Sequence, residues 1–320
     1  MKKLMKVVSL AVVAVMALSM TACGGGSAKY NVGVCQLVQH PALDAATEGF
    51  KAALKDKLGD DVYIDEQVAS GELTQCTPIV TTFVSNQYDL IMANATAALQ
   101  AASAATADIP ILGTSITDYA TALDEDNWTG VTGKNISGTS DLAPLDQQAA
   151  CLKELFPDAK KVGILYCSSE ANSQYQADVI AKELKDLGYE TEVFKFNDSN
   201  DVAAVTKNAC DNSDVIYVPT DNVVADCTEA INNVALPAKT PIFAGESGIC
   251  SGCGVATLSI DYYDLGYQTG LMAYEILVNG ADPATMEIQF APKVTKMFNE
   301  TNAKELNVAI PDDYEAIATE

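Results

Sequence analysis

Short apolar runs alternate with longer helical patterns along this chain, and the whole series occurs twice. This repeat constrains the possible fold more than any other feature of the sequence. Residues 32–37 form an apolar run of strand length, and residues 42–58 then place apolar side chains at helical spacing. Similar runs and helices follow as far as residue 112, and the plan starts again near residue 161. Such alternation predicts parallel sheets covered by helices on both faces. We therefore expect an α/β fold, and 320 residues suit two domains.

The repeat predicts two Rossmann-like lobes of similar topology, each with a parallel sheet. Strand patterns at 31–36, 89–93 and 109–112 return at 161–166, 214–218 and 240–243, at nearly constant spacing. We expect lobe one to contain residues 30–138 and about 260–290, because the helical pattern at 265–278 returns to it, and lobe two to contain residues 139–259. Residues 291–320 form a C-terminal segment in this division.

The first 29 residues carry the features of an export signal and a tether. Residues 1–22 join a basic start to an apolar stretch that is short for a membrane span, as in a signal peptide. The segment Leu18-Ser19-Met20-Thr21-Ala22-Cys23 resembles a bacterial lipobox, and residues 23–29 then comprise a lipidated Cys23 and a flexible tether. We expect an exported protein anchored to the outer face of the cell membrane through Cys23. An ordinary signal peptide with a chance cysteine is the alternative.

The charge balance excludes one class of partner. The chain has 19 Lys+Arg, every one a lysine, against 43 Asp+Glu, which gives a formal net charge of −24. Nucleic-acid phosphates require cations in place of their counterions, so we expect no nucleic-acid partner. Without arginine, the bidentate clamp that often holds carboxylates or phosphates is also absent.

Polar residues follow the predicted strands in both halves, where parallel sheets bind ligands. The candidate ligand-binding residues from lobe one are Gln36, Asn94, Ala95, Thr96, Ser115 and Thr117. Those from lobe two are Glu170, Asn172, Ser173, Thr220, Asp221, Asn222 and Glu246. Each also has a simpler interpretation, because such residues commonly cap helices.

The two sets differ in charge, which favours a zwitterionic ligand. Asn94 and Thr96 correspond to Pro219 and Asp221 in the second half, and Ser115 corresponds to Glu246, so lobe one supplies neutral groups and lobe two carboxylates. A ligand carboxylate can rest on a helix N-terminus of lobe one. We expect its ammonium to pair with Asp221 and Glu246.

The sequence argues against catalysis and against a metal or cofactor. It contains no nucleophile elbow, phosphate-binding loop or zinc-protease motif. Its single histidine, His40, is better explained by a structural or rim position than by catalysis. A carboxylate pair of Asp221 and Glu246, as in glycosidases, is the remaining enzymatic alternative.

A set of motifs resembles one known family. They are residues 39–45 (QHPALDA), 94–102 (NATAALQAA), 115–118 (SITD), 218–222 (VPTDN) and 260–270 (IDYYDLGYQTG). Over residues 30–280 the chain is similar to the ABC-transporter substrate-binding proteins whose better-known members bind tryptophan and related aromatic amino acids. The loop at residues 166–173 departs from the family pattern, although Glu170, Asn172 and Ser173 are retained.

The resemblance implies the periplasmic-binding-protein-like type I fold, with a hinge between two lobes. It implies a lipoprotein that captures an amino acid, such as tryptophan, tyrosine or phenylalanine, for an ABC permease, and we expect a monomer. Alternatives are a receptor for a nucleoside, sugar or peptide, and a sensory ligand-binding protein. Tyr166, Tyr262, Tyr263 and Phe83 are candidates for stacking on an aromatic ligand.

Eight cysteines remain besides Cys23. In an exported chain an even number permits disulfides, including a local one between the closest pair, Cys250 and Cys253, whereas a strictly anaerobic habitat would let all eight stay reduced. Cys35 and Cys151 lie in apolar patterns and fit small buried residues.

Overall fold

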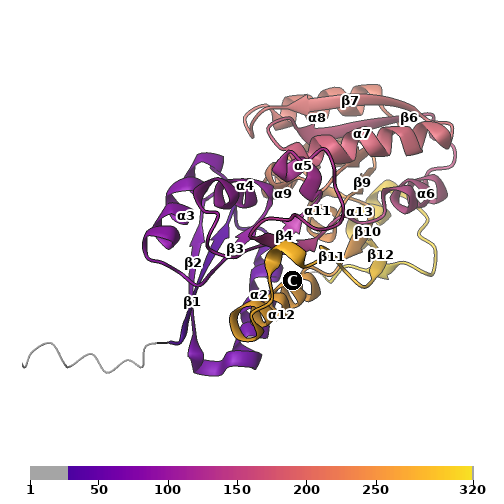
Figure 1. The fold of residues 1–320 in the computed structure, drawn as a ribbon. Helices are drawn as coiled ribbons and strands as arrows, with labels where there is room; N and C mark the ends of the chain where they lie inside the picture. The colour runs from indigo at the N-terminus through magenta and orange to yellow at the C-terminus, as the bar shows by residue number, and fades with distance from the viewer. Residues whose placement is uncertain (1–27, 319–320) are drawn as a thin grey trace, which may run out of the picture.

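The structure is a computed structural model that describes residues 28–318, and within them the chain forms two lobes (Figure 1). The predicted signal peptide and Cys23 lie outside the described residues. Between residues 28 and 318, no helix has both the length and the apolar character needed to cross a membrane.

A six-stranded sheet lies at the centre of lobe one, with the order β11-β5-β4-β3-β1-β2. All its neighbouring strands are parallel. The strands are β1 (Tyr30–Gln36), β2 (Val62–Val68), β3 (Leu90–Asn94), β4 (Ile111–Ile116), β5 (Ile136–Ser140) and β11 (Gln289–Phe290). The apolar runs of β3 and β4 are wholly buried because helices cover both faces of the sheet.

A seven-stranded sheet forms lobe two, with the order β13-β12-β10-β9-β8-β6-β7. Its strands are β6 (Lys161–Cys167), β7 (Glu190–Phe196), β8 (Val215–Val218), β9 (Ile242–Ala244), β10 (Ala256–Ile260), β12 (Val294–Phe298) and β13 (Glu315–Ala316). The pairs are parallel except β10 with β12, which is antiparallel. The fold class predicted from the alternation is confirmed.

Helices cover both sheets. In lobe one they are α2 (Pro41–Leu58), α3 (Cys76–Ser85), α4 (Thr96–Ala105), α5 (Tyr119–Leu123) and α12 (Tyr262–Asn279), with 3₁₀ turns at Gly59–Asp61, Leu73–Gln75 and Pro283–Thr285. In lobe two they are α6 (Leu145–Leu155), α7 (Ala171–Asp186), α8 (Val202–Asn212), α9 (Asn222–Asp226), α10 (Thr228–Ala238), α11 (Ser247–Cys253) and α13 (Glu300–Leu306).

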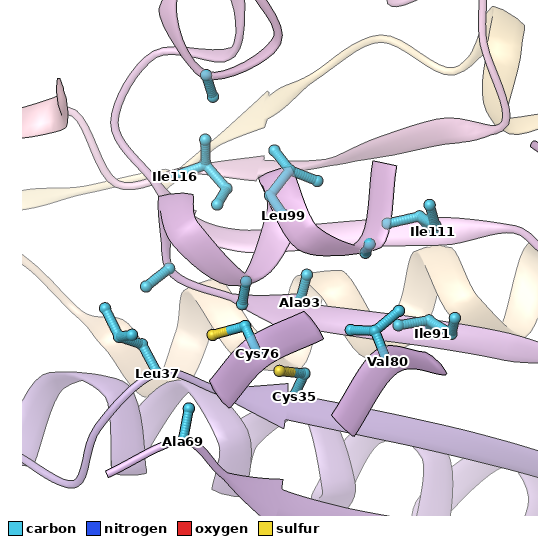
Figure 2. Close-up of a cluster of buried hydrophobic side chains, with 14 of the residues drawn as sticks. Cys35, Leu37, Ala69, Cys76, Val80, Ile91, Ala93, Leu99, Ile111 and Ile116 are labelled. Atoms are coloured by element: carbon cyan, nitrogen blue, oxygen red, sulfur yellow. The ribbon is translucent and has the colours of Figure 1, made fainter. Parts of the chain in front are cut away.

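Each lobe has its own hydrophobic core. In lobe one, α3 and α4 pack on one face of the sheet through a cluster that includes Cys35, Cys76 and Leu99 (Figure 2). Helices α2 and α12 pack on the other face through Phe50 and Met272. A Cβ atom added to Gly266 of α12 would lie 1.9 Å from the backbone oxygen of Ala46 in α2, so only glycine permits this approach.

The structure differs from the sequence-based division at two places. We expected lobe one to stop at residue 138, whereas β5 continues to Ser140 within its sheet. We treated residues 291–320 as a separate segment, whereas β12 and β13 belong to the sheet of lobe two. A two-residue strand such as β13 has no periodicity to read, and strand pairing is decided in three dimensions.

The chain crosses between the lobes three times. The crossings follow β5, β10 and β11, since each of these strands precedes an element of the other lobe. Three neighbouring crossings form a hinge about which two rigid lobes can rotate.

Candidate ligand site between the lobes

Residues that follow strands in both lobes line two adjoining cavities. The larger has a volume of about 250 Å³ and the smaller about 50 Å³. Both are lined by Leu37 and Leu73 of lobe one and by Ser169, Glu170 and Asn222 of lobe two. A wider hollow of about 800 Å³ lies between α2 and β2, but it contains none of the strand-end residues, so we place the ligand site between the lobes.

Helix α4 presents an uncapped N-terminus to the smaller cavity. Ala95 alone joins β3 to α4, with φ 92°, and no side chain caps the helix. Thr96 and Ala97, from the first turn, line the cavity. Free N–H groups and the helix dipole make such an end an anion site. Backbone strain at Ala95 fits a functional position.

Ser115 lies at the end of the neighbouring strand β4. Its φ is 54°, its side chain is 6% exposed, and its Oγ has no hydrogen-bond partner. A buried hydroxyl without a partner is costly to the fold. Ser115 lines neither of the two cavities.

Glu170 is the buried carboxylate of lobe two that lines both cavities, whereas the exposed Asp198 and Asp226 line only the larger one. Its Oε2 accepts hydrogen bonds from Nδ2 of Asn172 and Nδ2 of Asn222, each at 2.9 Å. It also accepts from the backbone N–H groups of Asn222 and Val223 at the start of α9, each at 3.1 Å. Burial raises the pKa of the Glu170 carboxyl. A cationic ligand group would offset this cost of burial.

Asp221 and Glu246, expected to bind the ammonium, both cap helices of lobe two. Oδ1 of Asp221 accepts from the N–H of Val224, and its Oδ2 accepts from the N–H of Cys167. The two oxygens of Glu246 accept from the N–H groups at the start of α11. Burial together with the charge of Glu170 raises the pKa of Asp221 to about 8, and burial raises that of Glu246 to about 7. Neither carboxylate lines the two cavities.

A fourth buried acid, Asp141, lies at the first crossing between the lobes. Its Oδ1 accepts from the hydroxyl of Thr117 at 3.1 Å, and its Oδ2 from the hydroxyl of Tyr262 at 3.0 Å. Burial raises its pKa to about 6. Asp141 is absent from the predicted site because the expected lobe boundary fell inside β5, and the position just after the strand was not recognised as a strand end.

Several other predicted site residues make hydrogen bonds that connect the elements around the cavities. Nε2 of Gln36 donates to Asp44, and Nδ2 of Asn94 donates to the carbonyl of Leu43, so both side chains engage α2. In lobe two, Asn172 and Ser173 each donate to the carbonyl of Thr220 at 3.3 Å. Four of the thirteen predicted residues line the cavities: Thr96, Glu170, Asn172 and Asn222.

Sequence reasoning missed several cavity residues. Leu37, Leu73, Gln100 and Ser169 all line the smaller cavity. Leu37 and Ser169 lie just after strand ends, so their positions in the sequence could have indicated them. Leu73 and Gln100 do not follow strands, and only the tertiary structure places them at the cavity. Of the four stacking candidates, Phe83 is buried in the core of lobe one and Tyr263 is exposed against Tyr267, so neither reaches these cavities.

Two α/β lobes joined by three crossings define the periplasmic-binding-protein-like type I fold, which more distant solved structures share. The family described as "ABC transporter substrate binding protein" matches residues 31–320. The chain belongs to this family.

Individual relatives carry more specific descriptions. A tyrosine-binding protein from Clostridioides difficile (strain R20291) is 37% identical over 286 residues, which cover 87% of this chain and 81% of the relative. An ABC domain from Streptococcus pneumonia, solved in complex with L-Trp, is 30% identical with a TM-score of 0.86, covering 91% of this chain and 100% of that one.

A second solved structure bears on the arrangement of the lobes. The ligand-free, open structure of a substrate binding protein with adhesive properties from Clostridium difficile is 35% identical, with a TM-score of 0.70 and the same coverage of 91% and 100%. The chain superposes better on the L-Trp complex although its sequence is nearer to the open protein. Its lobes therefore lie closer to the arrangement of the complex.

Proposed function

We propose that this protein is the receptor of an ABC importer and that it captures an aromatic amino acid between its lobes. One observation carries the proposal: the uncapped N-terminus of α4 and the carboxylate of Glu170 line the same cavity from opposite lobes. A helix N-terminus favours an anion and a buried carboxylate favours a cation. The pair therefore suits the two charged ends of an amino acid.

The charges assign each end of the ligand to a lobe. The ligand carboxylate rests on the N–H groups of Thr96 and Ala97, with the hydroxyl of Thr96 beside them. The ammonium pairs with Glu170, which Asn172 and Asn222 hold in place. The aromatic preference rests on the L-Trp complex and the tyrosine-binding relative.

The same proposal includes the setting of the protein. Cys23 is lipidated and anchors a monomer to the outer face of the cell membrane, and an ABC permease receives the ligand. The protein acts by binding and closure, without catalysis.

A thermal-shift screen of residues 28–320 against the common amino acids tests this function. A ligand at 100 times its Kd stabilises a protein by about 2.7 kcal/mol. We expect L-tyrosine, L-tryptophan or L-phenylalanine to raise the melting temperature. Tryptamine lacks the carboxylate and indole-3-propionate lacks the ammonium, so neither should do so. A flat response to every amino acid would overturn the proposal and direct the screen to nucleosides, sugars and peptides.

A further inference from the structure

The side chain of His40 in lobe one reaches across to lobe two. Nε2 of His40 lies 3.1 Å from Oδ1 of Asn222, and the histidine is 8% exposed. His40 immediately precedes α2 in lobe one, whereas Asn222 begins α9 in lobe two. Within residues 28–318, this is the one hydrogen bond that joins the two lobes directly, away from the crossings.

The neighbours of Asn222 fix the direction of this hydrogen bond. Nδ2 of Asn222 donates to Oε2 of Glu170 at 2.9 Å, so Oδ1 is the atom turned toward His40. Oδ1 is an acceptor, and the Nε2 atom of His40 must carry the hydrogen. A chain of donors therefore runs from His40 through Asn222 to Glu170.

Both ends of the contact are held in place by their own lobes. Pro41 follows His40 and restricts it to extended backbone, which is observed at φ −157° and ψ 163°. The His40 side chain does not cap α2, so it remains available to the other lobe. On the other side, Glu170 binds both the backbone and the side chain of Asn222. Little further ordering is needed when the lobes meet.

We propose that His40 and Asn222 form a latch, a hydrogen bond that holds the lobes closed over the ligand and slows its release. This inference rests on the proposed function, because the latch binds the same Asn222 that supports the ligand-facing Glu170. When the lobes part, Asn222 keeps its contacts with Glu170 while His40 passes into water. His40 is thus a positioning residue, which acts on the ligand through Asn222.

Ligand dissociation from two His40 variants tests the latch. L-tyrosine is the probe, and stopped-flow fluorescence of Trp128 follows its release. One hydrogen bond corresponds to roughly a five-fold change, so His40→Ala should release L-tyrosine about five times faster. His40→Gln retains an N–H donor and should recover most of the wild-type rate. The exposed Gln75→Ala of the same lobe is the control, and urea unfolding of the ligand-free variants should match the wild type.

Each other outcome has a defined meaning. Wild-type release rates in His40→Ala, or equal acceleration in His40→Ala and His40→Gln, would overturn the latch. If the wild type does not bind L-tyrosine, the proposed ligand is wrong. The latch is then tested by small-angle X-ray scattering of the ligand-free proteins. The radius of gyration should then be larger in His40→Ala than in the wild type and His40→Gln. Equal radii would overturn the latch.

Discussion

Oδ2 of Asp221 accepts a hydrogen bond from the backbone N–H of Cys167, with 2.7 Å between the two atoms. The carboxylate thereby joins the start of α9 to the end of β6, since its other oxygen caps α9 through Val224. Two strand-end segments that carry the site, residues 167–173 and 220–224, are thus tied together by a buried side chain. Asp221 therefore supports the segments that line the site without lining the cavities itself.

Replacing Asp221 by alanine should destabilise the ligand-free protein. The change leaves the N–H groups of Val224 and Cys167 buried without an acceptor, and we expect a loss of about 3 kcal/mol in urea unfolding. Asp118→Ala is the matched control, because Asp118 caps α5 through the single N–H of Thr121 at a more exposed site. It should cost about 1 kcal/mol. If the two variants were equally stable and only Asp221→Ala lost ligand binding, Asp221 would contact the ligand directly and this prediction would be wrong.

Replacing Glu170 by glutamine should weaken binding without unfolding the protein. The variant loses the charge that faces the ligand ammonium, so the Kd measured by calorimetry should rise about 10- to 100-fold. Stability should fall by only about 1 kcal/mol, because removal of a buried charge offsets the hydrogen bonds lost where the amide nitrogen faces N–H donors. Glu246→Gln is the control, since Glu246 lines neither cavity. An unchanged Kd in Glu170→Gln would contradict the assigned ammonium site.

The ligand-free protein should become more stable as the pH falls from 8 to 6.5. The folded-state pKa values of Asp221 and Glu246 are raised to about 8 and about 7, while unfolded carboxyls titrate near about 4. The folded state therefore binds more protons in this window, and protonation favours folding. Melting temperatures across these pH values check the sign, and Glu246→Gln should reduce the slope. A melting temperature that falls over the same window would refute these shifts.

The contact between α2 and α12 should not tolerate a larger residue at Gly266. An alanine Cβ there meets the backbone of Ala46 at 1.9 Å, so the helices must move apart. We expect Gly266→Ala to lose about 3 kcal/mol in denaturant unfolding, as overpacked cores do. Val278→Ala, at a 41% exposed position on the same helix, should stay within about 0.5 kcal/mol of the wild type. Similar stabilities of both variants would show that the helices can separate freely.

The cysteines should all titrate as thiols. The eight cysteines within residues 28–318 are free, including Cys250 and Cys253, whose spacing permitted a local disulfide and which lie buried on α11. Denatured protein comprising residues 28–320 should therefore give eight thiols per chain with a thiol reagent, before and after reduction. A count of six that rises to eight on reduction would reveal a disulfide.

The family and the alternation of strands and helices could be predicted from the sequence, and so could the strand-end position of the site. Residues 94–96 and 220–222 follow buried apolar strands, and parallel sheets bind ligands at that edge. The roles within the edge could not be predicted, because Asp221, Glu246 and Glu170 are all acids after strands or at helix starts. Only their hydrogen bonds separate two helix caps from a cavity-lining carboxylate.

The sequence by itself determined the fold class, because side-chain periodicity and turn chemistry are local properties of the chain. The tertiary structure decided which lobe received residues 291–318, which carboxylates met backbone N–H groups, and that His40 would meet Asn222 from 182 residues away. These contacts depend on strand pairing and lobe orientation, which arise from burial of whole faces against distant partners. Local sequence patterns carry no information about which residues, far apart in the chain, come into contact.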